Sequence, residues 1–187
     1  MMQAEFGATP WGRVWVRTIE STSAGGPNML LPKARTLARN STSIVAAGTG
    51  RVEADVTMSG EVCRVKIDLP IWPDGTQAEV GRLVAKAVAE HRGLVAGDLP
   101  DTLEADFRHH AISVAPHIQE LHSGCTCRSR KRPCVHVFAT IYALVQLVDE
   151  RPALAVELRS AAATAIATTD PDWVALSEFD PAAFYGD

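Results

Sequence analysis

The sequence predicts an α+β protein: a small antiparallel sheet with helices, plus a short module rich in cysteine and histidine. Two neighbouring segments in the first half alternate apolar and polar residues, the period of strands with one face in water. Two longer segments repeat apolar residues at the spacing of a helix. Three of the four cysteines fall within ten positions in a chain of 187 residues. That length allows one domain, or one domain with a small appended module.

A short helix with two buried tryptophans is expected near the start of the chain. Trp11, Trp15 and Ile19 recur at helical spacing. Thr9 can cap this helix, and Pro10 suits its first turn because proline has no amide hydrogen to leave unpaired. We interpret the aromatic pair as core packing.

Three strands are expected next, over residues 43–47, 51–58 and 62–69. The last two alternate regularly, and Ser59-Gly60 between them is typical of a hairpin turn. The sheet should therefore have one apolar face and one wet face. Cys63 falls on the apolar face, so we interpret it as a buried structural cysteine and not as a metal ligand.

Residues 76–91 form the next predicted helix, because their apolar residues make one stripe. Thr76 stands three residues before Glu79, which is the spacing of a capping box. A shorter helix is expected over residues 101–109. Residues 111–124 are interpreted as a connector.

The second half continues with helices and an acidic tail. Residues 137 to about 148 have a helical pattern that is apolar on most sides, and a further helix is expected from Pro152 to about residue 168. The tail after Pro171 is acidic and contains four aromatic residues: Trp173, Phe179, Phe184 and Tyr185. We divide the chain into an N-terminal α+β region (1–122), the cysteine-rich module (123–150) and a C-terminal helix with the acidic-aromatic tail (151–187).

Four residues have the types and the spacing of a structural zinc site: Cys125, Cys127, Cys134 and His136. Structural zinc takes four thiolate or imidazole ligands in a tetrahedron. The first two are two residues apart, so in an extended strand both can face one ion. The last two stand where the apolar helix begins, and the positive end of that helix favours a thiolate. His122 is an alternative ligand outside the two pairs.

The pattern Cys-x-Cys, six residues and Cys-x-His, followed by an apolar helix, resembles the SWIM-type zinc finger family. The chain is also similar to bacterial, actinobacterial-like members through Phe6-Gly7, Trp11-Gly12, Trp15 and residues 32–39. The resemblance covers roughly residues 6–160. It implies a β-β-α zinc module that holds Zn²⁺ and binds nucleic acid or protein. It also implies a partner, because bacterial members occur beside Swi/Snf-type helicase-like ATPases.

The basic residues between the two ligand pairs are the candidates for contact with DNA or RNA: Arg128, Arg130, Lys131 and Arg132. Residues 123–136 carry these four cations and no acidic residue, whereas the whole chain has a net charge of −4. Binding to phosphates would therefore be local. Three more cations would assist if the fold brought them close: Lys33, Arg35 and Arg39. A solvated loop that balances the charge of the metal site would explain the same four residues without nucleic acid.

We expect a binding protein and not an enzyme, because four good ligands close the zinc shell and catalytic zinc keeps an open position. One alternative is a protein adaptor for a helicase-like ATPase, which the acidic-aromatic tail suits. A more remote alternative is a Cys-x-Cys redox protein.

The chain opens without the apolar run of a secretory signal, and its longest apolar stretch is too short to cross a bilayer. We therefore expect a cytoplasmic protein without membrane contact, whose reduced thiols favour metal binding over disulfides.

Overall fold

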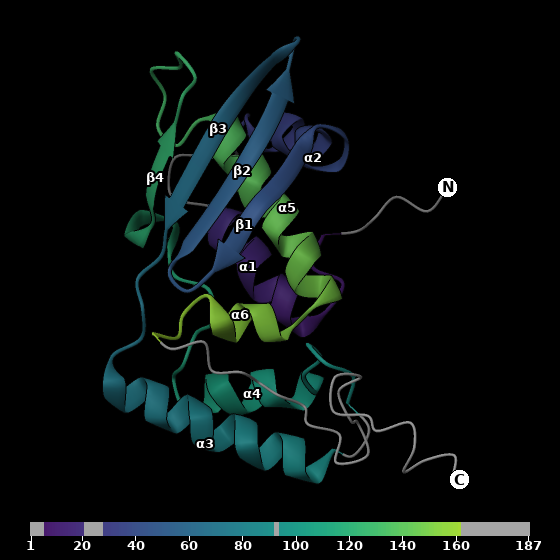
Figure 1. Cartoon of the computed structure of the whole chain (residues 1–187), viewed down its shortest axis with the longest axis vertical. Helices are drawn as coiled ribbons and strands as arrows, with labels where there is room; N and C mark the ends of the chain where they lie inside the picture. Colours follow the sequence, from purple (N-terminus) through teal and green to yellow (C-terminus); the bar gives the residue numbers. More distant parts are fainter. Residues whose placement is uncertain (1–5, 21–27, 92–93, 162–187) are drawn as a thin grey trace, which may run out of the picture.

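The computed structural model describes residues 6–20, 28–91 and 94–161, and it confirms the predicted α+β class (Figure 1). The described elements are α1 (Pro10–Glu20), α2 (Leu31–Asn40), β1 (Thr42–Gly48), β2 (Arg51–Met58), β3 (Glu61–Asp68), α3 (Asp74–Glu90), α4 (Asp101–His109), the 3-10 turn η1 (Ile118–Glu120), β4 (His122–Cys125), α5 (Val135–Glu150) and α6 (Ala153–Glu157). The four strands form one antiparallel sheet in the order β1-β2-β3-β4. Helices α1, α2 and α5 lie behind one face of the sheet, and α3 and α4 lie beyond one end of it (Figure 1).

The three predicted strands are confirmed as β1, β2 and β3, within a residue or two of their expected bounds. Ser59 and Gly60 form the turn between β2 and β3 with φ values of 53° and 82°, as a tight hairpin requires. Alternate residues of these two strands are buried under the helices: Val52, Ala54, Val56, Cys63, Val65 and Ile67. The opposite face carries cross-strand ion pairs between β2 and β3. The sheet therefore has the one dry and one wet face that the alternation predicts.

The prediction of a connector over residues 111–124 is wrong at its end, because β4 begins at His122. This strand extends the sheet along β3, with Val65 opposite Cys125 and Asp68 opposite His122. Its four residues show no apolar alternation, so the sequence pattern gives no sign of a strand. The last of them is the first predicted metal ligand, and strand pairing therefore fixes the position of that ligand.

Helix α5 is the central element of the core. Eleven of its 16 residues are buried, so it is enclosed on nearly all sides. It packs against α1, α2 and strands from both edges of the sheet. The predicted apolar helix is thus confirmed, with a start two residues earlier and an end two residues later than expected. A single cluster of buried residues includes side chains from α1, the sheet, α5 and α6.

The start of α1 is held by one carboxylate at the far end of α5. Asp149 accepts hydrogen bonds from the backbone N–H of Gly7 (2.9 Å), Ala8 (3.1 Å) and Thr9 (2.9 Å), and from the Thr9 hydroxyl (2.8 Å). The Thr9 hydroxyl in turn accepts from Gly12 N–H at 3.1 Å, which confirms Thr9 as the cap. A Cβ on Gly12 would lie 2.1 Å from the Asp149 carboxylate. Glycine at this position therefore lets α1 approach α5 closely enough for the carboxylate to cap it.

The two predicted core tryptophans, Trp11 and Trp15, are 0 % and 1 % exposed, so their interpretation as core packing is confirmed. Trp11 meets Phe107 of α4 edge to face, with ring centroids 5.7 Å apart. The predicted helix over residues 101–109 is confirmed as α4.

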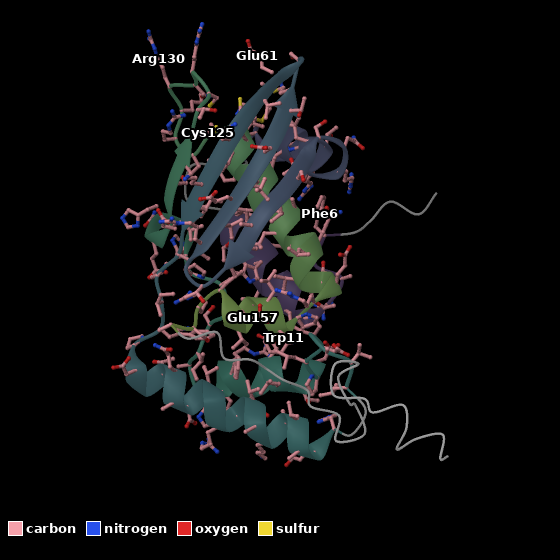
Figure 2. All side chains as sticks on the ribbon, in the orientation of Figure 1. Phe6, Trp11, Glu61, Cys125, Arg130 and Glu157 are labelled. Atoms are coloured by element: carbon pink, nitrogen blue, oxygen red, sulfur yellow. The ribbon has the colours of Figure 1, made fainter. Side chains whose placement is uncertain are left out.

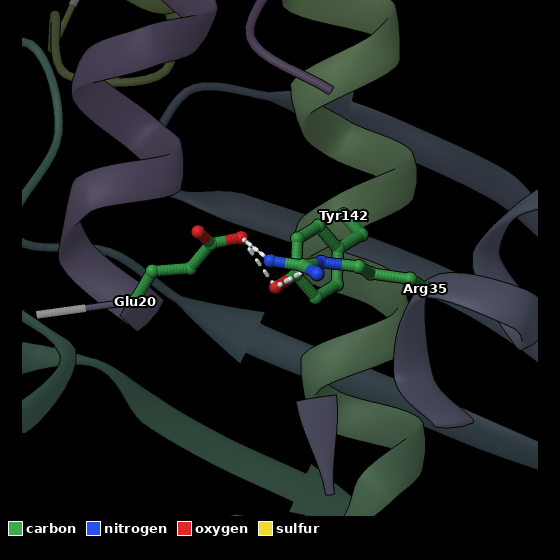
Figure 3. Close-up of polar contacts among 3 residues, drawn as sticks. All are labelled: Glu20, Arg35 and Tyr142. Atoms are coloured by element: carbon green, nitrogen blue, oxygen red, sulfur yellow. Dashed lines mark hydrogen bonds and ion pairs between the residues drawn. The ribbon is translucent and has the colours of Figure 1, made fainter. Parts of the chain in front are cut away.

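A polar contact joins α1, α2 and α5 beside this core (Figure 3). Tyr142 donates its hydroxyl hydrogen to Glu20 at 2.7 Å, and Arg35 donates to both Tyr142 (3.0 Å) and Glu20 (2.5 Å). Burial raises the pKa of Tyr142, and its hydrogen bond to Glu20 raises it further. Arg35, one of the three auxiliary candidates for phosphate contact, is therefore engaged in holding the helices together.

The predicted capping box of Thr76 and Glu79 is wrong. Helix α3 begins at Asp74, directly after Pro73, and no side chain caps its first turn by a hydrogen bond. Asp74 stands in that turn, where a carboxylate is favoured by the positive end of the helix. Glu79 binds Arg82 instead, with a shortest distance of 2.6 Å.

The predicted helix from Pro152 to about residue 168 is shorter than expected, because α6 ends at Glu157. The carbonyls of Leu158 and Arg159 accept hydrogen bonds from Gly50 N–H (2.9 Å) and Trp72 N–H (2.8 Å). These bonds tie the chain to neighbouring segments where a helix would have continued. Residues from 162 onward, including the acidic-aromatic tail, lie outside the described residues.

Replacing Asp149 with alanine should lower the free energy of unfolding by about 2–3 kcal/mol, because four donors lose a charged acceptor. Urea unfolding of the variant measures this loss. The matched control is the exposed neighbour Glu150, whose replacement with alanine should change stability by less than about 0.5 kcal/mol. Equal effects of the two substitutions would contradict the capping role of Asp149.

Candidate metal centre

The four predicted ligands come together at the junction of β4 and α5. The sulfur atoms of Cys125, Cys127 and Cys134 and a ring nitrogen of His136 all lie within 4.8 Å of one another. Cys125 ends β4, Cys127 follows it in the loop, Cys134 is the N-cap of α5, and His136 lies in its first turn. This group can hold a metal ion.

Strand pairing positions the first ligand pair. Beyond the last paired residue of β4, Thr126 N–H donates to the Arg64 carbonyl at 3.1 Å. Arg64 N–H donates to the Thr126 hydroxyl at 3.0 Å. These bonds hold Thr126 against β3, but the chain bends at Thr126 and Cys127, and Cys127 N–H donates to Cys125 Sγ at 3.5 Å. A turn at the end of the strand, and not the extended strand that the spacing predicts, therefore brings the two cysteines together.

The start of α5 positions the second pair. Cys134 has extended backbone angles, φ −86° and ψ 172°, and its side chain makes no capping hydrogen bond. Its carbonyl accepts from Phe138 N–H at 3.2 Å, so the backbone begins the helix while the thiol stays available. The expectation that Cys134 stands at the start of the helix is confirmed, and its Sγ and His136 Nδ1 are near enough to face one ion.

The distances within the group suit a tetrahedral ion. His136 Nδ1 lies 3.7 Å from Cys125 Sγ and 3.9 Å from Cys134 Sγ. With Zn–S near 2.3 Å and Zn–N near 2.0–2.1 Å, the edges of a zinc tetrahedron are about 3.5–3.8 Å. Cys134 and His136 are buried and the other two ligands are half-buried, so a bound ion would be largely shielded from water. The residues present therefore fit a structural metal.

The electrostatics of the group differ between its two half-buried cysteines. Burial is the main cause that raises the pKa of Cys125 to about 12. Burial also opposes ionisation of Cys127, but hydrogen bonds from Ser129 N–H, His136 and the neighbouring cysteines outweigh it and lower the pKa of Cys127 to about 6. Arg132 Nη1 lies 3.8 Å from Cys127 Sγ and adds a positive charge there. Three thiolates and a divalent ion carry a net charge of −1, which this guanidinium offsets.

His122, the alternative ligand, is exposed on β4 opposite Asp68 and is not part of the group. Cys63 is buried, as predicted, but its thiol interacts with Cys125 and Cys127. Nothing in the sequence pattern indicates that Cys63 lies near the predicted ligands. The apolar alternation of β3 places Cys63 on the inner face, but only the pairing of β3 with β4 brings the cysteines together.

The four basic candidates occupy the loop between the ligand pairs, and all four are exposed: Arg128, Arg130, Lys131 and Arg132. Figure 2 shows Cys125 near the base of this loop and Arg130 extending away from the fold at its far end. Within the described part of the chain, none of the four forms an ion pair. The fold does not add Arg35 to this set, because Arg35 contacts α5 at Tyr142, about 12 Å along the helix from Cys134.

Comparisons with known proteins leave the activity open. The chain is 29 % identical, over 147 residues, to the uncharacterised protein Rv2102 of Mycobacterium tuberculosis. The match covers 77 % of this chain and 52 % of that protein, so the chain spans about half the length of the relative it matches. No family model matches the chain, and no solved structure matches it. Within the described residues, no helix has the length and apolarity to cross a membrane.

One metal ion per chain should bind, and His136 should be required for it. Cobalt(II) added to the reduced, metal-free protein should give the absorption of a tetrahedral site with thiolate ligands, saturating at one equivalent. His136→Ala should weaken binding and change the spectrum, because one of the four donors is removed. His122→Ala is the control and should titrate like the wild type. A variant without His136 that kept the wild-type spectrum would disprove the ligand assignment.

Proposed function

We propose that this chain is a non-catalytic, SWIM-type zinc module that binds nucleic acid through its basic loop. The observation that supports it most is the geometry of residues 125–136. Four mutually close donors stand at the two ends of a loop whose four cations are exposed and without ion-pair partners among the described residues.

Zinc is the metal that suits this donor set best. Three thiolates and one imidazole in a tetrahedron are typical of structural zinc, whereas magnesium and calcium select oxygen ligands. Four protein ligands leave no open position for a water or a substrate. A site of this kind stabilises a local structure, and for this reason we propose binding and not catalysis.

The metal would determine the shape of the basic loop. Cys127 precedes the cations and Cys134 follows them, so an ion bound to both sulfurs holds the ends of the loop together. Arg128, Arg130 and Lys131 are exposed and form no ion pair among the described residues, so they lose little on binding phosphates, whereas Arg132 also lies beside Cys127 Sγ. Each phosphate contact releases counterions from the nucleic acid. Because the whole chain has a net charge of −4, the interaction is confined to this loop and its immediate surroundings.

A protein adaptor for a Swi/Snf-type helicase-like ATPase is the second candidate. It is favoured by a groove of about 470 Å³ along β4, whose lining includes Leu121, Gly124 and Arg132. Among the described residues, β4 is the last strand of the sheet. An unpaired strand edge can accept a strand from another protein. In that case the basic loop would flank the protein interface and nucleic acid would not be required.

Binding to nucleic acid should weaken steeply with salt. Four phosphate contacts predict a slope of log affinity against log salt of about −3 to −4. Replacing the four loop cations with serine should flatten this slope and leave one zinc ion bound per chain, since none of the four is a ligand and Arg132 only offsets the charge of the site. The measurement is fluorescence anisotropy with labelled single- and double-stranded oligonucleotides.

The matched control changes the net charge equally but away from the loop, through serine at four exposed cations of α1, α3 and α4: Arg17, Arg82, Lys86 and Arg108. This control should keep most of the slope. If the wild type shows no salt-sensitive binding to DNA or RNA at micromolar concentration, the nucleic-acid proposal fails and the adaptor becomes the leading candidate.

A further inference from the structure

The fourth cysteine of the chain lies beside the three cysteines of the metal centre without belonging to it. Cys63 is on the inner face of β3 and is 8 % exposed. It is outside the group of four mutually close donors. In the proposed zinc site its thiol would therefore remain uncoordinated.

The pairing of β3 with the chain around β4 brings Cys63 to the first ligand pair. Val65 is opposite Cys125, and the two hydrogen bonds between Arg64 and Thr126 continue this register by one residue. β4 ends at Cys125, and the chain bends at Thr126 and Cys127. Cys63 is two residues from Val65 on the same face of β3, which makes it the diagonal cross-strand neighbour of Cys125. Diagonal neighbours in an antiparallel pair are close enough for long side chains to contact each other.

A second observation agrees with this placement. The Cys63 thiol interacts with the side chains of both Cys125 and Cys127. Both half-buried ligands thus lie close enough to Cys63 to act on its thiol.

We propose that Cys63 is the resolving cysteine of an oxidative switch, which forms a disulfide with Cys125 or Cys127 when a peroxide oxidises the metal centre. The inference rests on the proposed metal binding, because loss of a ligand sulfur is what would release the ion. Cys63 suits this role since an uncoordinated thiol can react without first leaving the metal.

The chemistry takes place in two steps. A peroxide oxygen is transferred to the ligand sulfur: the O–O bond breaks, an S–O bond forms, and hydroxide leaves when the peroxide is hydrogen peroxide. The Cys63 sulfur then attacks the sulfenic sulfur, the S–O bond breaks, and the departing oxygen takes the Cys63 proton to leave as water. The two sulfurs together lose two electrons and the peroxide gains them. One thiolate ligand is consumed, so the ion loses its closed shell.

The test uses the full chain, loaded with zinc and treated with hydrogen peroxide. Zinc release is followed with a chromogenic chelator, and disulfides are mapped by mass spectrometry of the unreduced, alkylated digest. We expect release of the ion together with a disulfide that contains Cys63. Reduction with dithiothreitol should restore full zinc binding.

Cys63→Ala tests the role of the resolving thiol. This variant should still bind one zinc ion, but after peroxide treatment it should recover less zinc binding than the wild type. Without its resolving thiol, more of the sulfenic acid proceeds to irreversible sulfinic acid, and only the other ligand cysteines remain to trap it. Val65→Ala is the control, because it truncates the next inward side chain of β3 and keeps every thiol; it should behave like the wild type. Cys63→Ser, which preserves the volume better, serves if the alanine variant does not fold.

The outcomes separate this inference from the proposed function. A chain that carries no zinc before peroxide is added would refute the metal proposal. A zinc-loaded wild type that forms disulfides only among Cys125, Cys127 and Cys134, with Cys63 still open to alkylation after unfolding, would overturn the inference alone. Recovery of zinc binding in Cys63→Ala equal to that of the wild type after oxidation would overturn it as well.

Discussion

Helix α5 is apolar on almost every side, and most of the structure follows from the need to enclose it. If a helix of this kind lay on the surface, one of its apolar sides would be exposed to water. Burial on all sides removes that apolar area from water and is therefore favoured. Helices α1 and α2 and the inner face of the sheet together provide that enclosure. The two ends of α5 then become fixed points, with Asp149 near one end and Cys134 and His136 at the other. The candidate metal centre thus stands on the most buried element of the fold.

The same arrangement explains why the site combines a rigid base with an exposed loop. One ligand pair belongs to the edge of the sheet and the other to the start of the central helix. A metal ion coordinated by both pairs would cross-link two elements that already pack together. The six residues between Cys127 and Cys134 are left outside this link, and their cations face water. The four donors that need precise geometry are therefore on the scaffold, and the cations that the proposed function assigns to nucleic acid are on the exposed loop.

The four cysteines differ in environment. Cys134 is shielded at the helix N-terminus, whereas Cys125 and Cys127 are half-buried beside the basic loop. Cys63 is buried against them from the neighbouring strand. A thiolate bound to a metal is held in place and partly neutralised, and a nearby free thiol is not. The contrast arises from strand register alone, since a shift of one residue in β3 would turn Cys63 to the wet face of the sheet.

The sequence by itself determined the features that depend on neighbouring residues. The spacing of Cys125, Cys127, Cys134 and His136 identified the four donors that the fold brings together, because the end of a strand and the start of a helix limit where residues two apart can lie. Periodicity likewise located α5, the hairpin of β2 and β3, and the buried Trp11 and Trp15.

Only the tertiary structure decided the features that join distant segments. Asp149 caps a helix start 142 positions away from it at Gly7, and Arg35 binds Tyr142 across 107 positions. Strand β4, the early end of α6 and the approach of Cys63 to the ligands likewise depend on hydrogen bonds between segments far apart in the chain. Such contacts form when separate elements pack against one another. A local pattern of apolar and polar residues does not indicate which elements will pack together.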